Sequence, residues 1–248
     1  MKKLVAFDLD GTLAESKQAL EPEMAALLAG LAEQVAVAVI SGGDWPQFEK
    51  QIIARLPKGA DLTNLYIMPT TGTKLYRCKQ GEWTQIYADI FKPEERDAIV
   101  KALDDAGKQT GLDREKTWGQ QIEDRGSQIT FSALGQDAPI DAKKAWDPDF
   151  AKRKRMQKIV QGEISGFAIN VGGSTSIDIT REGTDKASAM RELAKQSGIA
   201  TEDMIFLGDA IYPGGNDYAV KAAGIDTLTV RDPDETKAVI AGMLAFLR

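Results

Sequence analysis

The sequence contains no histidine and only one cysteine, Cys78. The absence of histidine excludes histidine-based catalytic triads, zinc sites built on imidazole and histidine general bases. A single cysteine cannot form a disulfide within the chain, which is typical of a protein from a reducing compartment. Any acid–base catalysis must therefore use Asp, Glu, Lys or Tyr.

The chain also lacks a long apolar run. The apolar residues 4–7 are followed at once by Asp8, so the run is too short for the core of a signal sequence. No apolar stretch approaches the ~18 residues that span a membrane. We therefore expect a soluble, cytoplasmic protein without a membrane partner.

Basic residues are in the minority: 31 Lys and Arg against 37 Asp and Glu give a net charge of -6. One basic run stands out, at residues 152–155, within a segment of helical periodicity, and we interpret it as a solvated helix face. Because nucleic-acid-binding domains usually carry a basic surface, we expect no nucleic-acid partner.

The order of strand and helix patterns divides the chain. Its 248 residues suffice for one large domain or two modest ones. Strands and helices alternate at the start and again after Gly183, which favours a parallel sheet. The middle indicates an α+β layer with an open antiparallel sheet covered on one side. We predict a discontinuous α/β core, residues 1–84 and 184–248, and an inserted domain at residues 85–183.

The element predictions follow from periodicity and turn residues. Outside the middle segment, strands are predicted at residues 4–7, 35–40, 65–68, 204–207 and 227–230, and helices at residues 21–31, 45–56, 185–197, 216–223 and 233–247. Between residues 73 and 183, strands are predicted at residues 73–77, 82–87, 127–134, 166–171 and 174–180, and helices at residues 93–106 and 150–163.

Two carboxylates follow the first strand directly. Asp8 and Asp10 are separated by one residue, and Gly11 then permits a sharp turn. Open α/β sheets bind their ligands at the carboxyl ends of their strands. The pair is therefore a candidate metal site, a nucleophile beside a general acid, or both; the alternative is a solvated turn.

Three further segments carry suitable groups. Ser41 and Gly42 end a strand and open a helix, where a hydroxyl and glycine amides can hold phosphate oxygens; a simple strand-to-helix turn is the alternative. Lys186 starts another helix and could equally be a solvated lysine. Asp209 follows an apolar strand, and a glycine-rich loop leads from it to Asp217, which is the most specific of the three signals.

In this order the acid pair, hydroxyl, lysine and second acid pair resemble the haloacid dehalogenase-like phosphotransferases, over the whole chain. The inserted domain lies between the hydroxyl and lysine motifs, as in the branch with the larger (C2) cap. The resemblance implies a Rossmann-like three-layer core with a parallel sheet, plus an inserted α+β cap that carries substrate specificity.

The resemblance also implies roles for the core motifs. Asp8 matches the nucleophile that becomes an aspartyl phosphate, and Asp10 the general acid–base. Asp8, the Asp10 carbonyl and Asp209 would hold Mg²⁺, with Asp217 nearby. The groups that would bind the transferring phosphoryl group are Ser41, Gly42 and Lys186.

Within that branch, the finer similarity is to the eukaryotic-type phosphomannomutases. It rests on the long loop between Gly208 and Asp217 and on the segment from Gly172 to Asp178. Five cap positions are implied to bind substrate: Arg125, Gln136, Lys143, Ser176 and Asp178. For Arg125, Lys143 and Ser176 the alternative is ordinary exposed cap surface.

Three positions depart from that pattern. Gln136 and Lys143 stand where the family has cap arginines, and Lys17 where an arginine follows the first motif. A glutamine supplies neither the charge nor the two-pronged hydrogen bonding of arginine on a phosphate. A mutase must hold a bisphosphate in two orientations, whereas a phosphatase needs one phosphate site, so these substitutions favour hydrolysis.

The sequence thus predicts a Mg²⁺-dependent enzyme that transfers a phosphoryl group of hexose phosphates through an aspartyl phosphate. A sugar-phosphate phosphatase (a hydrolase) is slightly preferred over a phosphomannomutase (an isomerase). The rival classes are a non-catalytic sugar-phosphate sensor on the same fold and a protein-interaction module with an exposed apolar cap face. The resemblance also suggests a homodimer formed through the cap.

Overall fold

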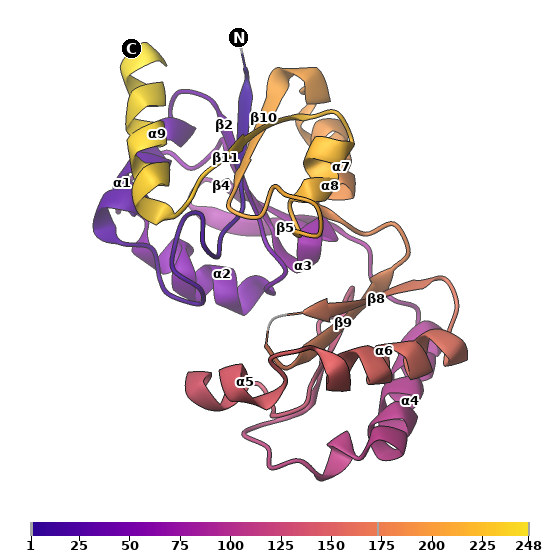
Figure 1. The fold of residues 1–248 in the computed structure, drawn as a ribbon. Coiled ribbons are helices and arrows are strands. Elements are labelled where there is room, and N and C mark those ends of the chain that lie inside the picture. Colours follow the sequence, from indigo (N-terminus) through magenta and orange to yellow (C-terminus); the bar gives the residue numbers. More distant parts are fainter. Residues whose placement is uncertain (1, 173, 248) are drawn as a thin grey trace. The chain divides into compact units, whose positions relative to one another are not determined.

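The computed structural model describes residues 2–172 and 174–247 (Figure 1). The chain forms two compact units, one made of Met1–Ala88 and Thr184–Arg248 and the other of Asp89–Gly183. The boundary expected after residue 84 falls inside a strand that continues to Ala88. We describe each unit by itself.

A seven-stranded sheet forms the centre of the first unit, in the order β11-β10-β1-β2-β3-β4-β5. The pairs from β11 to β3 are parallel, and β4 and β5 add an antiparallel hairpin at one edge. The strands are β1 (Leu4–Phe7), β2 (Ala36–Ile40), β3 (Leu65–Met68), β4 (Lys74–Lys79), β5 (Glu82–Ala88), β10 (Met204–Gly208) and β11 (Asp226–Thr229). The sheet is therefore mainly parallel, as the alternating patterns predict.

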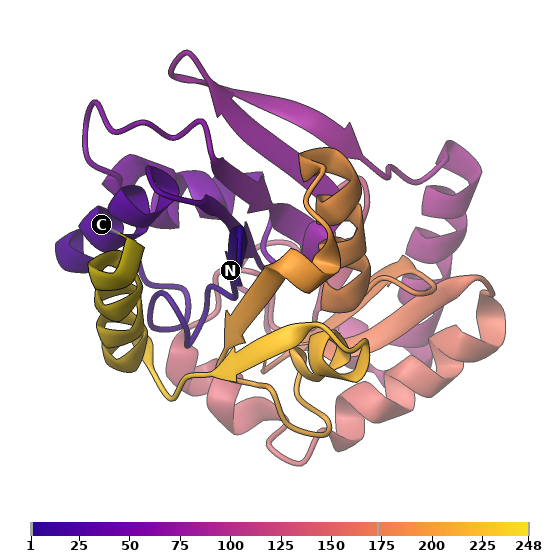
Figure 2. The ribbon, with the colours of Figure 1, turned by 90° about the horizontal axis from the view of Figure 1, so that it is seen from above.

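Helices cover both faces of this sheet, because successive residues of a buried strand point to opposite sides. Val5 and Phe7 join the hydrophobic cluster on one face of the sheet, whereas Leu4 and Ala6 join the cluster on the opposite face. The first face carries α1 (Pro22–Ala32), α2 (Trp45–Gln51) and α9 (Pro233–Leu247), and the second α7 (Lys186–Ser197) and α8 (Tyr218–Ala222) (Figure 2). This arrangement confirms the three-layer α/β core.

The second unit is an α+β layer. Its four-stranded antiparallel sheet has the order β6-β7-β9-β8, with β6 (Ile122–Asp124), β7 (Ile129–Ser132), β8 (Phe167–Gly172) and β9 (Ser176–Arg181). The helices are α4 (Pro93–Thr110), α5 (Ile140–Trp146) and α6 (Ala151–Glu163). Leu103 of α4 and Val160 of α6 share a core with Ile129 and Ile177, so these helices cover one face of the sheet. The patterns did not predict β6 or α5.

The basic run at residues 152–155 is only partly solvated, and the prediction of a solvated face is wrong at Arg153. Its side chain is 2% exposed, and its Nε donates to Asp147 at 2.8 Å. The guanidinium also donates to the carbonyl of Gly172 at 3.2 Å and lies over the ring of Phe150. Every fourth residue or so of a helix returns to the same face, so one member of a charged run can face the core.

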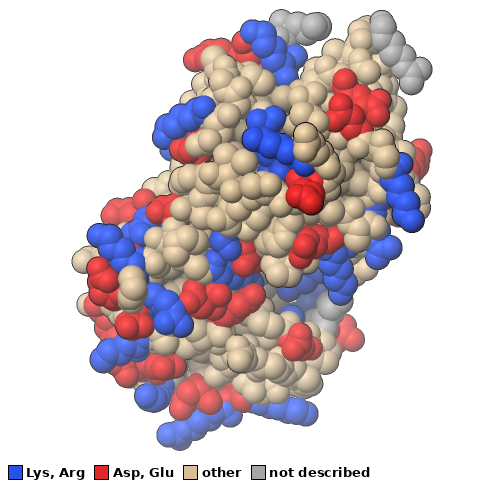
Figure 3. All heavy atoms as spheres, turned by 180° about the vertical axis from the view of Figure 1, so that it is seen from behind, with Lys and Arg blue, Asp and Glu red and all other residues tan. Residues whose placement is uncertain are grey.

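Charges of both signs are interspersed on the face drawn in Figure 3. Within residues 2–172 and 174–247, none of the helices combines the length and apolar character needed to traverse a bilayer.

Candidate active site

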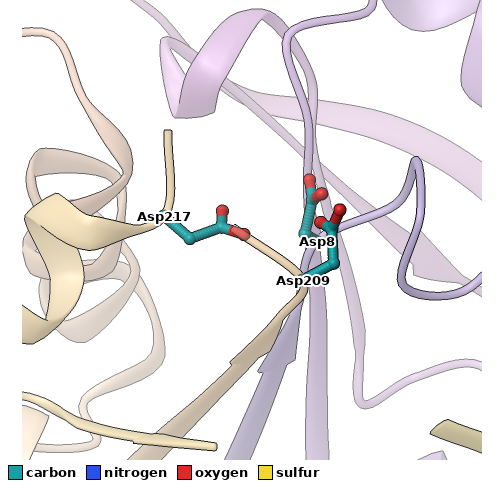
Figure 4. Close-up of side chains that lie close together, drawn as sticks. All are labelled: Asp8, Asp209 and Asp217. Atoms are coloured by element: carbon teal, nitrogen blue, oxygen red, sulfur yellow. The ribbon is translucent and has the colours of Figure 1, made fainter. Parts of the chain in front are cut away.

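Three carboxylates meet at the carboxyl edge of the core sheet. Phe7 of β1 pairs with Leu207 of β10, so Asp8 and Asp209 leave the sheet at neighbouring strand ends. The loop after β10 then returns the chain to the same place and delivers Asp217 just before α8. One oxygen from each of the three carboxylates lies within 4.8 Å of the others (Figure 4).

Two glycines allow the acids to approach this closely. A Cβ on Gly208 would lie 2.3 Å from Asp217 Oδ2, and one on Gly11 would lie 2.6 Å from Asp209 Oδ2. Gly11 also has a φ of +87°, which side chains disfavour. The glycines of the two acidic motifs are thus required by the packing of the site as well as by its turns.

Lys186 connects two of the acids. Its side chain is 3% exposed, and its Nζ lies 2.5 Å from Asp8 Oδ1 and 2.5 Å from Asp217 Oδ1. Asp185 caps α7 by accepting the N–H of Ser188 at 2.7 Å, so Lys186 is the first helical residue. The alternative of a solvated lysine is therefore wrong for Lys186.

Burial controls the ionisation of the cluster. It raises the pKa of Asp8 to about 6, against the attraction of Lys186. Burial also raises the pKa of Asp209, and the neighbouring charge of Asp217 adds to the effect. Burial opposes the charge on Lys186, but attraction by Asp8 and Asp217 outweighs it and raises the pKa of the lysine. Three carboxylates around one ammonium leave an excess of negative charge, and this all-oxygen donor set could hold a divalent cation such as Mg²⁺.

The other predicted core residues lie beyond the same sheet edge. Asp10 is outside the three-carboxylate cluster, and its Oδ1 accepts the backbone N–H of Lys17 at 2.7 Å. Ser41 follows β2 directly and is 4% exposed, while Gly42 beside it is exposed. The structure thus joins Asp8, Asp209, Asp217 and Lys186 by direct proximity.

One further residue of this edge, Thr12, was not among the predicted site residues. Its hydroxyl accepts the backbone N–H of Asp209 at 3.1 Å, which ties the β1 loop to the end of β10. The sequence signal is the hydroxyl that directly follows Asp-x-Asp-Gly.

Asp178 is the centre of a polar cluster in the second unit. Its Oδ1 accepts hydrogen bonds from Thr130 Oγ1 at 2.7 Å and from Gln128 Nε2 at 3.1 Å. Burial raises the pKa of Asp178, while these hydrogen bonds and the charge of Arg125 oppose the shift. Arg125 itself pairs with Glu123 at 2.7 Å. Gln128 and Thr130 were not predicted, although their alternation with Ile129 places them on the face opposite the helices.

The remaining cap predictions lie on nearby segments. Ser176 is the first residue of β9 and pairs with Ser132. Lys143 Nζ donates to the backbone carbonyl of Gln136 at 2.8 Å. The side-chain Nε2 of Gln136 is buried and has no hydrogen-bond partner among the described residues. An unpaired buried amide can donate to a ligand, and leaving it unpaired is unfavourable.

Comparison with known proteins identifies the class of this protein. Residues 5–220 match the family model of the haloacid dehalogenase-like hydrolases, and the chain belongs to this family. The expected membership is confirmed, and the protein is a phosphotransfer enzyme of the haloacid dehalogenase type.

Its relatives share modest identity over nearly the whole chain. A phosphomannomutase of Encephalitozoon cuniculi is 26% identical over 245 residues, which is 95% of this chain and 91% of the relative. Human phosphomannomutase 1 is 27% identical over 231 residues, or 88% of this chain and 83% of the relative.

Solved structures agree with the fold. A Plasmodium falciparum IMP-nucleotidase superposes with a TM-score of 0.73 at 18% identity, covering 100% of this chain and 71% of that one. A trehalose-6-phosphate phosphatase related protein superposes with a TM-score of 0.60 at 18% identity, covering 98% of this chain and 97% of that one.

Proposed function

We propose that the protein hydrolyses hexose phosphates in a Mg²⁺-dependent reaction through an aspartyl phosphate on Asp8. The observation that carries this proposal is the cluster in which the buried Asp8 lies beside the half-buried Asp209, the buried Asp217 and the buried Lys186. A buried carboxylate that is fixed by a lysine and flanked by cation-binding oxygens is suited to attack a phosphate.

The reaction has two steps. An oxygen of ionised Asp8 forms a bond to phosphorus while the bond from phosphorus to the sugar oxygen breaks, and Asp10 gives a proton to that oxygen. Asp10 then takes a proton from water, whose oxygen attacks the aspartyl phosphate, releasing inorganic phosphate and restoring Asp8.

The chain's own groups supply binding and charge. Because the pKa of Asp8 is about 6, its carboxylate is ionised at neutral pH. Lys186 would neutralise charge on the transferring phosphoryl group, and Ser41 and Gly42 would bind its oxygens. Asp8, Asp209, Asp217 and the Asp10 carbonyl would hold Mg²⁺, which supplies electrostatic stabilisation of the phosphate charge.

Gln136 supports water, and not a second sugar phosphate, as the acceptor of the phosphoryl group, because it stands where the mutases have a phosphate-binding arginine. Among the cap positions expected to bind substrate, it offers a neutral amide with an unpaired donor, suited to a sugar hydroxyl. A phosphomannomutase that interconverts mannose 6-phosphate and mannose 1-phosphate is the second candidate, and it is supported by relatives with that name. In either case the cap groups Arg125, Lys143, Ser176 and Asp178 would contact the sugar phosphate.

The test is an incubation with Mg²⁺ and mannose 1-phosphate, with and without a catalytic amount of hexose 1,6-bisphosphate. Free phosphate and mannose 6-phosphate are measured separately. We expect steady phosphate release without isomerisation. Isomerisation that requires the bisphosphate, with little phosphate release, would instead establish the mutase.

The nucleophile is tested by Asp8→Asn, with the exposed Asp226→Asn as its control. We expect the first variant to lose turnover and the second to retain it. Unchanged turnover in Asp8→Asn would refute the proposed nucleophile. If the wild-type protein binds sugar phosphates but does not turn them over, the sensor is favoured.

A cytoplasmic location and a homodimer through the cap stay predictions. Sedimentation of the purified protein tests whether it is a dimer.

A further inference from the structure

The turn after β3 has an unusual backbone. Thr70 and Thr71 have φ values of 49° and 57°, and Gly72 follows with a φ of 81°. Left-handed backbone is routine for glycine but strained for a β-branched residue. Such strain persists only where the surrounding structure fixes it, and it gathers at functional sites.

Both threonine amides hold the loop that follows β2. Thr70 donates its N–H to the carbonyl of Gly43 at 2.8 Å, and Thr71 donates to the carbonyl of Ser41 at 2.9 Å. The left-handed conformation is what points two successive amides at this loop. The candidate phosphate-binding segment, residues 41–43, is thus held at both of its ends.

A third tether comes from the start of β4. Lys74, which is 7% exposed, places its Nζ 2.6 Å from Asp44 Oδ1. Asp44 is the residue before α2, so the pair fixes the chain just beyond residues 41–43.

The opposite side of the turn packs on the helix that carries Lys186. A Cβ on Gly72 would lie 2.2 Å from the Cβ of Ala189 and 2.9 Å from its Cα. Ala189 lies in the first turn of α7, which begins at Lys186. The same short segment therefore contacts both elements that are expected to bind the phosphoryl group.

We propose that residues 70–74 are positioning residues, which fix the spacing between the loop of Ser41 and Gly42 and the ammonium of Lys186 so that both contact one phosphoryl group. This inference rests on the proposed function and adds to it the device that sets the geometry. A misplacement of about 1 Å in groups that position a substrate costs up to ~100-fold in rate, so a turn that fixes their spacing offsets its own backbone strain.

The test is the affinity for inorganic phosphate, measured by calorimetry with saturating Mg²⁺. Gly72→Ala introduces the clash with Ala189 and should raise the Kd for phosphate about tenfold. Gly198→Ala is the matched control, because Gly198 ends the same helix with a φ of +72° and no atom lies within 4 Å of a Cβ there. It should lower the melting temperature while changing the Kd less than about twofold.

A second substitution separates positioning from general damage. Adding Ala189→Gly to Gly72→Ala removes the atom at 2.2 Å, and it should recover part of the lost phosphate affinity although glycine weakens the helix. Lys74→Met serves if Gly72→Ala does not fold. It should weaken phosphate binding several-fold, whereas the exposed Lys195→Met should not.

The outcomes are distinct. An unchanged Kd in both Gly72→Ala and Lys74→Met, with a wild type that binds phosphate, would overturn this inference alone. A wild type that binds no phosphate in the presence of Mg²⁺ would overturn the proposed function itself. Loss of affinity in Gly198→Ala equal to that in Gly72→Ala would show that destabilisation, and not position, was measured, and would also overturn the inference.

Discussion

At the residue scale, the site concentrates like charge where water is excluded. Asp8 is 4% exposed and Asp217 is completely buried, and Lys186 is the cation that contacts both. For Asp8, burial disfavours the ionised carboxylate more than the charge of Lys186 favours it. The arrangement that suits catalysis therefore opposes stability in the metal-free protein.

Replacing Asp8 should reveal this opposition. The pKa of Asp8 is raised from 3.8 to about 6 on folding, so the folded state binds more protons between these values and loses stability as pH rises through them. Asp8→Asn removes that loss. In EDTA at pH 7.5 we expect the variant to be more stable than wild type by about 2–3 kcal/mol, and to lose this advantage near pH 4. Denaturant melts at both pH values measure it; a variant less stable at pH 7.5 would contradict the raised pKa.

The buried pair of Asp147 and Arg153 predicts that removing the acid costs more stability than removing the base. Asp147 also accepts the backbone N–H groups of Lys152 and Arg153, at 3.0 and 3.2 Å, so it keeps partners when the guanidinium is removed. Arg153 without Asp147 is a buried cation without its counter-charge. Asp147→Ala should therefore cost about 3–5 kcal/mol of unfolding free energy, more than Arg153→Met, with the exposed Arg155→Met near zero. Denaturant titration gives the order, and equal losses would refute the asymmetry.

At the scale of elements, the start of α7 links stability to the site. The side chain and backbone of Asp185 exchange hydrogen bonds with Ser188, which closes the first turn of the helix. Lys186 emerges from that turn. A change in the cap should thus affect both the helix and the lysine it presents.

Asp185→Ala should destabilise the protein by about 1 kcal/mol, because one N-cap acceptor is lost. It should also lower turnover by loosening Lys186. Asp185→Ser retains a cap acceptor and is the control, for which we expect near wild-type melting and activity. Thermal melts and phosphate-release rates test both effects; a turnover loss that serine does not restore would mean that the carboxylate itself acts in catalysis.

Element predictions succeeded where the signal is local. Residues 4–7 and 65–68 are strands with the predicted bounds, because short apolar runs between polar turns bury on both faces. The strand expected at residues 127–134 spans only Ile129–Ser132. Ser127 and Gln128 belong instead to a turn, which the backbone N–H of Arg125 closes by donating to the carbonyl of Gln128. The left-handed Thr70 and Thr71 have no sequence signal, because threonine favours extended backbone.

At the scale of the whole molecule, the two units divide the chemistry. The acidic cluster lies entirely in the unit formed by both ends of the chain, and the cluster around Asp178 lies in the inserted unit. Each unit has its own hydrophobic core. Independent cores allow each unit to respond separately to ligands and substitutions.

Mg²⁺ should therefore act on one unit. Binding to the native state stabilises it by about 2.7 kcal/mol at a concentration 100 times the Kd, so the calorimetric transition of the core unit should rise in temperature. The transition of the inserted unit should stay in place. Asp209→Asn should abolish the shift and the exposed Asp226→Asn should keep it, and a shift that survives in Asp209→Asn would place the ion elsewhere.

Local sequence patterns were enough to predict which side chains stand at strand ends. Asp8, Ser41 and Asp209 each follow an apolar strand, and parallel strands place such residues at one edge because their carboxyl ends coincide. The α/β core and its inserted α+β unit followed from the same local patterns.

Which of these groups meet depends on how distant segments pack together. Lys186 contacts Asp8 across 178 positions of the chain, and Arg153 is buried although its neighbours in the run are exposed. The turn at residues 70–72 is left-handed because its amides and Gly72 fit between two other segments. Such features depend on strand register and close packing between distant segments, which local periodicity does not encode.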